Sequence, residues 1–261
     1  MRSSSDEQVL NGGNINSVVR VGDTVRRLTG LHSRTIHDYL LHLEQKNVPA
    51  PRFLGIDDSK REVLSFIHGD TEYSDDIWKG ETALIKAARM LRQLHDASLD
   101  FVAPEPASWV YCHPDPEQRE VICHNDFAPY NMIFHNGVPK AIVDFDLCGP
   151  GPRTRDLAYL AYWMTPLSFA DDDLRGFSES DANAGSHRLR LLCRSYGGQP
   201  PQEVLPMVSE VLHHMSDEEA VEKMVGTEAV VRLKADGHLD HWSREARAFD
   251  GMFERLMANV S

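Results

Sequence analysis

The chain has 261 residues, 41% apolar and 26% charged, which is enough for one large domain or two packed lobes. Its 27 Lys and Arg against 40 Asp and Glu give a formal net charge of −13, which disfavours nucleic acid as a partner and would attract a small cation. Many proteins are equally acidic for solubility alone. No apolar run approaches the roughly 20 residues that span a bilayer, and the N-terminus lacks a secretory pattern, so we expect a cytoplasmic protein that does not bind membranes.

The first part of the chain is predicted to be a mostly antiparallel sheet with one inserted helix. The predicted elements are a hairpin over residues 8–28, a helix over 33–45, and strands over 53–56 and 62–67. The hairpin turns at Gly22-Asp23, and Ile36, Leu40 and Leu43 recur at helical spacing. Two further strands around a polar turn would complete the sheet.

After residue 70 the pattern becomes mainly helical, interrupted by short apolar strands that carry polar loops. The stripe of Leu84, Ala87, Leu91 and Leu94 predicts an amphipathic helix. Short strands are predicted over 121–123, 132–134 and 141–143, and helices over 156–164, 187–196, 203–213 and 241–257. We find no internal repeat and no long linker, which favours a compact arrangement.

Three polar residues in the middle of the chain carry the strongest functional signal. Asp126 follows a short apolar strand, Asn131 comes five residues later, and Asp144 ends the apolar run Ala141-Ile142-Val143. A carboxylate at Asp126 would accept the proton of an attacking hydroxyl, while oxygens of Asn131 and Asp144 would hold Mg²⁺, a hard ion that prefers oxygen ligands. Alone, each is equally typical of a loop residue, so it is the combination that predicts phosphoryl transfer.

Two neighbours of this set have less specific patterns. Asp146 should share the strand face of Asp144, and it is either a carboxylate that supports the metal site or a hydrogen-bonding loop residue. His124 is predicted to be a packed, hydrogen-bonded structural residue rather than a base.

A longer motif contains these residues. His124-x-Asp126-x4-Asn131 is followed by Val143-Asp144-Phe145-Asp146 and then by Arg155-Asp156-Leu157-Ala158. This pattern resembles the aminoglycoside phosphotransferase family of small-molecule kinases over nearly the whole chain. The resemblance implies an α+β, bilobal, protein-kinase-like fold. Residues 1–69 would form a small antiparallel β lobe with one helix, and residues 70–261 a larger, mainly helical lobe. It also implies Asp126 as catalytic base, Asn131 and Asp144 as Mg²⁺ ligands, and Asp156 as a brace for the catalytic loop.

The nucleotide-binding cation departs from the family pattern. Such kinases usually place a Lys on the third strand and a partner Glu on the helix. Here Arg26 is our first candidate for the cation and Arg27 the second, while His37 and Asp38 lie near the place of the Glu. Arg26 could equally be a solvated cation on a strand.

Two further segments are candidate nucleotide contacts. Gly12 and Gly13 would let backbone N–H groups approach phosphate, although the loop lacks a GxGxxG pattern. The strand that ends in Ser65, Phe66 and Ile67 would be the hinge between the lobes, with its backbone at a purine edge and Phe66 or Ile67 against the ring. An ordinary buried edge strand would have the same sequence pattern.

The acceptor would bind in the helical part. Asp171, Asp172 and Asp173 offer a negative patch suited to ammonium groups, although a solvated acidic loop has the same composition. We therefore expect a kinase, monomeric or homodimeric, that requires Mg²⁺ and transfers phosphate from ATP or GTP to a hydroxyl of a cationic small molecule. An aminoglycoside or amino sugar is the leading candidate. The alternatives are a kinase for choline-like alcohols, homoserine or macrolides, a nucleotide-binding pseudokinase, and a metal-dependent hydrolase.

Overall fold

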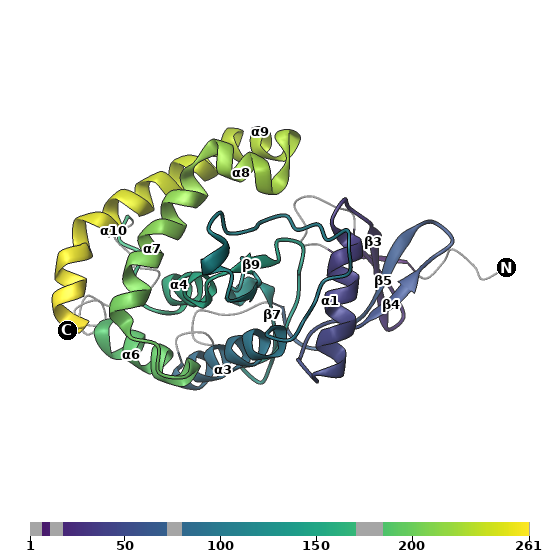
Figure 1. Ribbon diagram of the computed structural model, residues 1–261, viewed down its shortest axis with the longest axis horizontal. Coiled ribbons are helices and arrows are strands. Elements are labelled where there is room, and N and C mark those ends of the chain that lie inside the picture. The colour runs from purple at the N-terminus through teal and green to yellow at the C-terminus, as the bar shows by residue number, and fades with distance from the viewer. Residues whose placement is uncertain (1–6, 11–17, 72–79, 171–184, 261) are drawn as a thin grey trace.

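The computed structural model describes residues 7–10, 18–71, 80–170 and 185–260. At one end of the molecule, five antiparallel strands form a sheet in the order β1-β2-β3-β5-β4, with the helix α1 packed beside it (Figure 1). These elements are β1 (Gln8–Leu10), β2 (Val18–Val21), β3 (Thr24–Leu28), α1 (Ser33–Gln45), β4 (Phe53–Ile56) and β5 (Arg61–Ser65). The hairpin, the helix and both later strands are thus confirmed, and α1 has the predicted bounds.

The rest of the molecule is mainly helical and fills the other side of Figure 1. Within the described residues its helices are α3 (Glu81–Ser98), α4 (Arg153–Met164), α6 (Gly185–Tyr196), α7 (Pro201–Ser216), α8 (Glu218–Val225), α9 (Thr227–Ala235) and α10 (His238–Val260). Between α3 and α4 lie two small antiparallel pairs, β6 (Val121–Cys123) with β9 (Gly149–Gly151) and β7 (Met132–His135) with β8 (Val138–Ile142). The expected α+β architecture, with a small antiparallel sheet and one helix at one end and a mainly helical remainder, is therefore confirmed.

One apolar core connects the sheet end to the helical end. It runs from α1 and β5 through α3 and α4 to α7 and α10, and Tyr39, Leu91, Leu157 and Phe249 are among its fully buried side chains. After β5, Asp70 exchanges two backbone hydrogen bonds of 2.8 Å with Phe134 of β7. This pairing fixes the crossing of the chain from the sheet to the helical part.

The α8–α9 hairpin is the main element that our sequence analysis left unassigned. Asp217 caps α8 by accepting a 2.7 Å hydrogen bond from the Ala220 N–H. Gly226, at φ 85°, separates α8 from α9, and Gly237, at φ 74°, separates α9 from α10. The hairpin has a small apolar cluster of its own, which Val221 and Val230 form with Leu239 of α10.

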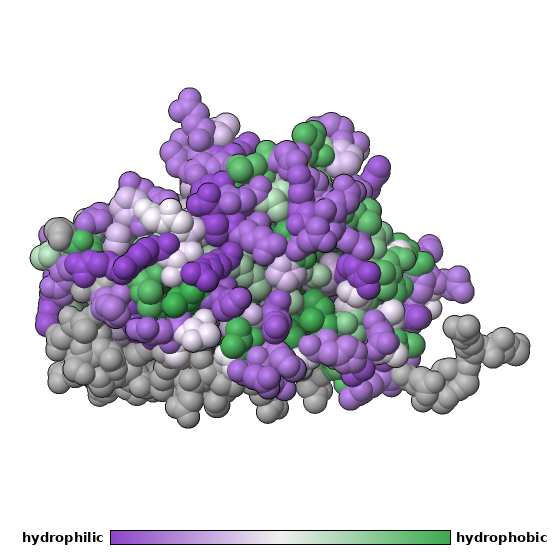
Figure 2. Space-filling view, turned by 90° about the horizontal axis from the view of Figure 1, so that it is seen from below, coloured by the Kyte–Doolittle hydropathy of each residue, from purple (hydrophilic) through white to green (hydrophobic). Residues whose placement is uncertain are grey.

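Hydrophilic residues predominate on the face shown in Figure 2, and apolar residues lie between them in separate patches. None of the helices in the described ranges is both long enough and apolar enough to cross a membrane.

Candidate active site

The loop between β6 and β7, our candidate catalytic loop, presents Asp126. One carboxylate oxygen of Asp126 accepts a short hydrogen bond from the Tyr130 hydroxyl, and the other accepts one of 2.8 Å from the Asn131 side-chain amide. Burial raises the pKa of Asp126, although the hydrogen bond from Tyr130 opposes this shift. The five-residue spacing thus folds Asp126 and Asn131 against each other, as the sequence predicted.

The buried carboxylate of Asp156, in the first turn of α4, holds the loop through hydrogen bonds. Asp156 accepts hydrogen bonds from the backbone N–H groups of His124, at 2.6 Å, and Asn125, at 2.8 Å. Nε2 of His95 donates to the same carboxylate at 2.9 Å, and both side chains are fully buried. Asp156 therefore lies where the predicted brace should lie. His95, which the sequence analysis did not single out, fixes its orientation.

Side chains also connect this loop to the loop after β8, where Asp144 and Asp146 lie beyond the end of the strand and not on a strand face as we expected. Asn125 has an unusual positive φ of 63°, and its amide donates to the Leu147 carbonyl at 2.7 Å and accepts from Arg155 at 2.9 Å. His124 is buried, and its Nε2 donates to the Val143 carbonyl at 3.1 Å. These contacts agree with a structural role for His124 and hold the two motifs side by side.

Asn131 and Asp144 come from adjacent segments that the backbone joins, because the Val143 N–H donates to the Asn131 carbonyl at 2.9 Å. The Asn131 amide nitrogen faces Asp126, so its side-chain oxygen remains available to a cation. Asp144 has a positive φ of 66°, a strained conformation that is common at functional sites. With Asp146 nearby, the donors are carboxylate and amide oxygens, a set that fits Mg²⁺.

The two arginines of β3 point to opposite faces of the sheet. Arg26 pairs with Asp57 at 3.4 Å. Arg27 points toward the loop that follows β8 and contacts Asp144 at 3.3 Å and Asp146 at 2.9 Å. The order of our two candidates for the nucleotide-binding cation is thus reversed: Arg27, not Arg26, lies beside the predicted metal ligands.

The partner of this cation comes from a strand and not from the helix. The Arg27 Nε donates to Glu62 of β5, whose other carboxylate oxygen accepts from His37 of α1. His37, which we placed near the usual position of the Glu, is therefore joined to the cation through Glu62. Arg27 and Glu62 stand directly opposite each other in the β3–β5 ladder. This position could be recognised only after the strand register was known.

The predicted hinge residues have partners of their own. The Ser65 hydroxyl accepts a 2.9 Å hydrogen bond from the Arg52 N–H, and the Phe66 N–H donates to the Asp23 carbonyl at 2.9 Å. The guanidinium of Arg20 lies 3.8 Å from the centre of the Phe66 ring. The Phe66 ring, which we expected to pack on a purine, is thus already in contact with Arg20. Ile67, our other candidate for this contact, is the next residue along the chain. Gly12 and Gly13 lie outside the described residues.

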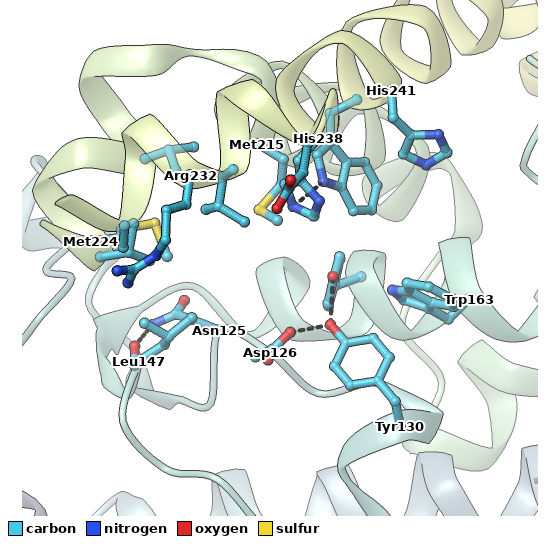
Figure 3. A pocket seen from close by; sticks show the side chains of 17 residues that line it. Asn125, Asp126, Tyr130, Leu147, Trp163, Met215, Met224, Arg232, His238 and His241 are labelled. Carbon is cyan, nitrogen blue, oxygen red and sulfur yellow. Dashed lines mark hydrogen bonds between the residues drawn. The ribbon is translucent and has the colours of Figure 1, made fainter. Parts of the chain in front are cut away.

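A cavity of about 600 Å³ opens on the side of Asp126 away from the sheet (Figure 3). We call it the acceptor cavity. Asn125, Asp126, Tyr130 and Trp163 lie on its floor, while Arg232 and other side chains descend from the opposite helices. Four aromatic residues line it, namely Tyr130, Tyr159, Trp163 and Trp242.

The roof of the acceptor cavity comes largely from the hairpin that the sequence analysis did not assign. Met224 and Val225 of α8, Ala229 and Arg232 of α9, and His238 of α10 contribute to it. Asp217 and the acidic residues after it, with glycines at Gly226 and Gly237, are helix start and stop signals that could have revealed the hairpin. Asp171, Asp172 and Asp173, our predicted substrate patch, lie outside the described residues.

Comparison with known proteins identifies the family. Residues 102–192 match the model of the phosphotransferase enzyme family. The trifolitoxin immunity protein of Rhizobium leguminosarum bv. trifolii is 33% identical over 198 residues, which is 74% of this chain and 75% of that protein. The chain belongs to the phosphotransferase enzyme family.

Solved structures agree with this family at the level of the fold. A choline/ethanolamine kinase family protein from Mesorhizobium loti is 19% identical, with a TM-score of 0.58 over 98% of this chain and 92% of that one. The ternary complex of streptomycin, ATP and the phosphotransferase APH(2″)-IIa is 13% identical, with a TM-score of 0.51 over 93% of this chain and 92% of that one. The predicted family is confirmed, and the protein is a phosphotransferase that acts on an alcohol group.

Proposed function

We propose that this phosphotransferase requires Mg²⁺ and transfers the γ-phosphate of ATP to a hydroxyl of a small molecule bound in the acceptor cavity. The observation that carries the proposal is the position of Asp126, which lies on the cavity floor with Asn131 hydrogen-bonded to it. A hydroxyl group, that of Tyr130, already donates to its carboxylate, so the geometry suits an acceptor hydroxyl. The choice of ATP rests on the similar fold of a phosphotransferase solved with ATP and streptomycin.

Each polar group has a distinct role in direct transfer. Asp126 orients the acceptor hydroxyl and takes its proton late in a loose transition state. Asn131 and Asp144 would hold Mg²⁺, which would neutralise charge on the phosphates when bound. Arg27 binds phosphate oxygens through its forked N–H groups. Asp156 keeps the catalytic loop in place through the two backbone N–H groups that it binds.

We propose that the acceptor is a compact alcohol with an ammonium group, the class that contains amino sugars and choline-like amino alcohols. Aromatic faces attract cations by about 0.5–2 kcal/mol, and four aromatic residues line the cavity. Among the described lining residues, carboxylates come from Asp126 and Asp236 alone, while Arg232 adds a positive charge. This lining suits one or two ammonium groups better than the many of a large aminoglycoside. We therefore narrow the acceptor class expected from the sequence to compact alcohols with one or two ammonium groups.

A protective role is a second candidate, favoured by the 33% identity to an immunity protein. Adding a phosphate to a toxic compound that carries a hydroxyl would give it a large negative charge and alter its binding elsewhere. Expression in cells that are sensitive to a panel of such compounds would test this role. Protection by the native chain but not by Asp126→Ala would support it, and equal protection by both would contradict it.

The direct test is a screen for nucleotide-dependent phosphorylation. Purified protein would be incubated with Mg²⁺, ATP or GTP, and amino alcohols, amino sugars, aminoglycosides, macrolides or homoserine. ADP or GDP release and the mass of the acceptor would both be measured. We expect one acceptor class to gain the mass of a phosphate, with Asp126→Ala as the inactive control.

The same screen separates the two rivals. Nucleotide binding without transfer to any acceptor would indicate a pseudokinase, while phosphate release from phosphoesters without nucleotide would indicate a hydrolase. Either result would contradict the proposed kinase.

A further inference from the structure

The guanidinium of Arg27 lies between two groups of carboxylates. On one side its Nε donates to Glu62, and on the other its terminal nitrogens contact Asp144, at 3.3 Å, and both oxygens of Asp146. A guanidinium has five N–H donors in one plane, so it can bind both groups together. In this conformation Arg27 acts as the counter-ion of the two carboxylates nearest to the predicted metal site.

Burial makes the contact between Arg27 and Glu62 stronger than an ordinary surface ion pair, whereas the side chains of Asp144 and Asp146 are 50% and 47% exposed. The side chain of Arg27 is 13% exposed and that of Glu62 only 3%. Charges in such surroundings are screened less by water and salt than exposed ones. Arg27 keeps its positive charge at any physiological pH, because a guanidinium is not deprotonated in proteins.

Glu62 is itself fixed from a second direction. His37 of α1 donates to its other carboxylate oxygen, and the His37 ring stacks on Phe53 of β4 at a centroid distance of 3.9 Å. Burial favours the neutral form of Glu62, yet the hydrogen bond from His37 and the charge of Arg27 outweigh it and lower its pKa. A rigid anion thus faces Arg27 on the side away from Asp144.

This arrangement has a consequence for divalent cations. The guanidinium binds both oxygens of Asp146 and one oxygen of Asp144, and its positive charge repels a second cation. Nucleotide phosphates would offer Arg27 alternative acceptors of higher charge. The carboxylates would then become available.

We propose that Arg27 is a resident cation that blocks Asp144 and Asp146 in the nucleotide-free protein, and that Glu62 is the positioning residue that keeps Arg27 ready to leave them. This inference rests on the proposed role of Asp144 in holding Mg²⁺. It implies that the divalent cation binds together with the nucleotide and not before it. Without Glu62, the guanidinium would rest on Asp144 and Asp146 alone and would block them more firmly.

The first test is Mn²⁺ binding to nucleotide-free protein, measured from the free Mn²⁺ signal in electron paramagnetic resonance. Arg27→Met should bind Mn²⁺ about ten-fold or more tightly than the native protein, because the repelling charge is gone. Arg26→Met is the matched control, since it removes a cation from the other face of the same strand, and it should leave Mn²⁺ affinity unchanged. Equal Mn²⁺ affinity of Arg27→Met and the native protein would overturn the proposal.

The second test uses Glu62→Gln, with Mn²⁺ binding measured in the presence of ADP. We expect the affinity for Mn²⁺ to fall about five-fold or more. Without the Glu62 carboxylate, the Arg27 guanidinium is held by Asp144 and Asp146 alone, so it competes more strongly with Mn²⁺ for them. In an Arg27→Met background the same substitution should change nothing, because Glu62 acts through Arg27. A purely structural Glu62 would lower the melting temperature and leave Mn²⁺ affinity unchanged in both backgrounds, which would contradict its positioning role.

Two controls make every outcome informative. If Arg27→Met leaves Glu62 buried without its cation and the protein fails to fold, the double variant Arg27→Met/Glu62→Gln removes both charges and should show the same gain in Mn²⁺ affinity. Asp144→Asn tests the proposed function separately. If it leaves Mn²⁺ binding with ADP intact, the metal assignment fails; if it abolishes that binding while Arg27→Met has no effect, only the present inference fails.

Discussion

On the sheet side of the catalytic loop, Arg27, Glu62 and His37 form a chain of buried charged contacts, whereas on the helical side aromatic rings surround a cavity. The charged chain joins β3 and α1, which follow one another in sequence, to β5, where Glu62 lies 35 positions after Arg27. The cavity roof comes instead from consecutive helices, α8 to α10. Phosphates are similar in all nucleotides, so a fixed set of charges can bind them. Acceptors differ from one another, and the α8–α9 hairpin that covers the cavity can vary with the acceptor without disturbing the charged network.

The largest effect is expected at Asp126, which lies between the charged network and the cavity. Replacing it with Ala should lower kcat about 10³-fold, because general base catalysis supplies roughly 10²–10⁴-fold. Nucleotide affinity, measured by titration with a fluorescent ADP analogue, should stay within about two-fold of the native value, since the Arg27 network is untouched. Undiminished turnover would remove Asp126 from its assigned role.

Both regions depend on the loop that Asp156 holds. Asp156→Asn should destabilise the fold by about 3 kcal/mol, because it removes the buried carboxylate that accepts hydrogen bonds from His95 and from two backbone N–H groups. Burial raises the pKa of Asp156, but the hydrogen bond from His95 outweighs it, so the pKa lies below its ordinary value. The carboxylate therefore stabilises the fold above about pH 4, and this contribution is lost as the pH falls through the lowered pKa.

Urea unfolding of the native protein and Asp156→Asn at several pH values would check this prediction. The difference in unfolding free energy should be full near pH 7 and should shrink below about pH 4. A difference that stays constant down to pH 3 would show that shape, and not charge, is what Asp156 contributes.

On the cavity side alone, Trp163→Leu should raise the KM of a cationic acceptor about ten-fold, because a cation–π contact contributes about 0.5–2 kcal/mol. The KM of ATP should not change. A neutral analogue, with carbon in place of the ammonium nitrogen, should be affected much less. Equal effects on the charged and neutral acceptors would mean that Trp163 provides only apolar contact.

The smallest effect is expected at Tyr130. Its hydroxyl binds Asp126 and lies 2.8 Å from the Tyr159 hydroxyl. Tyr130→Phe frees a carboxylate oxygen for water, so ATP hydrolysis without an acceptor should rise about three-fold. Tyr159→Phe removes the second hydroxyl without touching Asp126 and is the control. Unchanged hydrolysis in Tyr130→Phe would show that this hydroxyl does not exclude water.

The features that depend on short segments of the chain could be predicted from the sequence alone. The helix over 33–45 and the hairpin before it could be predicted, and the candidate set Asp126, Asn131 and Asp144 could be recognised, because each depends on spacing within a short segment. Helix periodicity and a five-residue loop need no knowledge of distant partners. The family resemblance rested on the same local motif.

Which charged side chains come into contact depends on long-range pairing in the tertiary structure. Arg26 and Arg27 are neighbours with the same chemistry, and the strand register alone turns Arg27 toward Asp144, because a shift of one residue exchanges the two faces of a strand. Glu62 became the partner of Arg27 through pairing across 35 positions of sequence. The acceptor cavity likewise exists only because α8 and α9 fold back over Asp126, a long-range packing that no local pattern specifies.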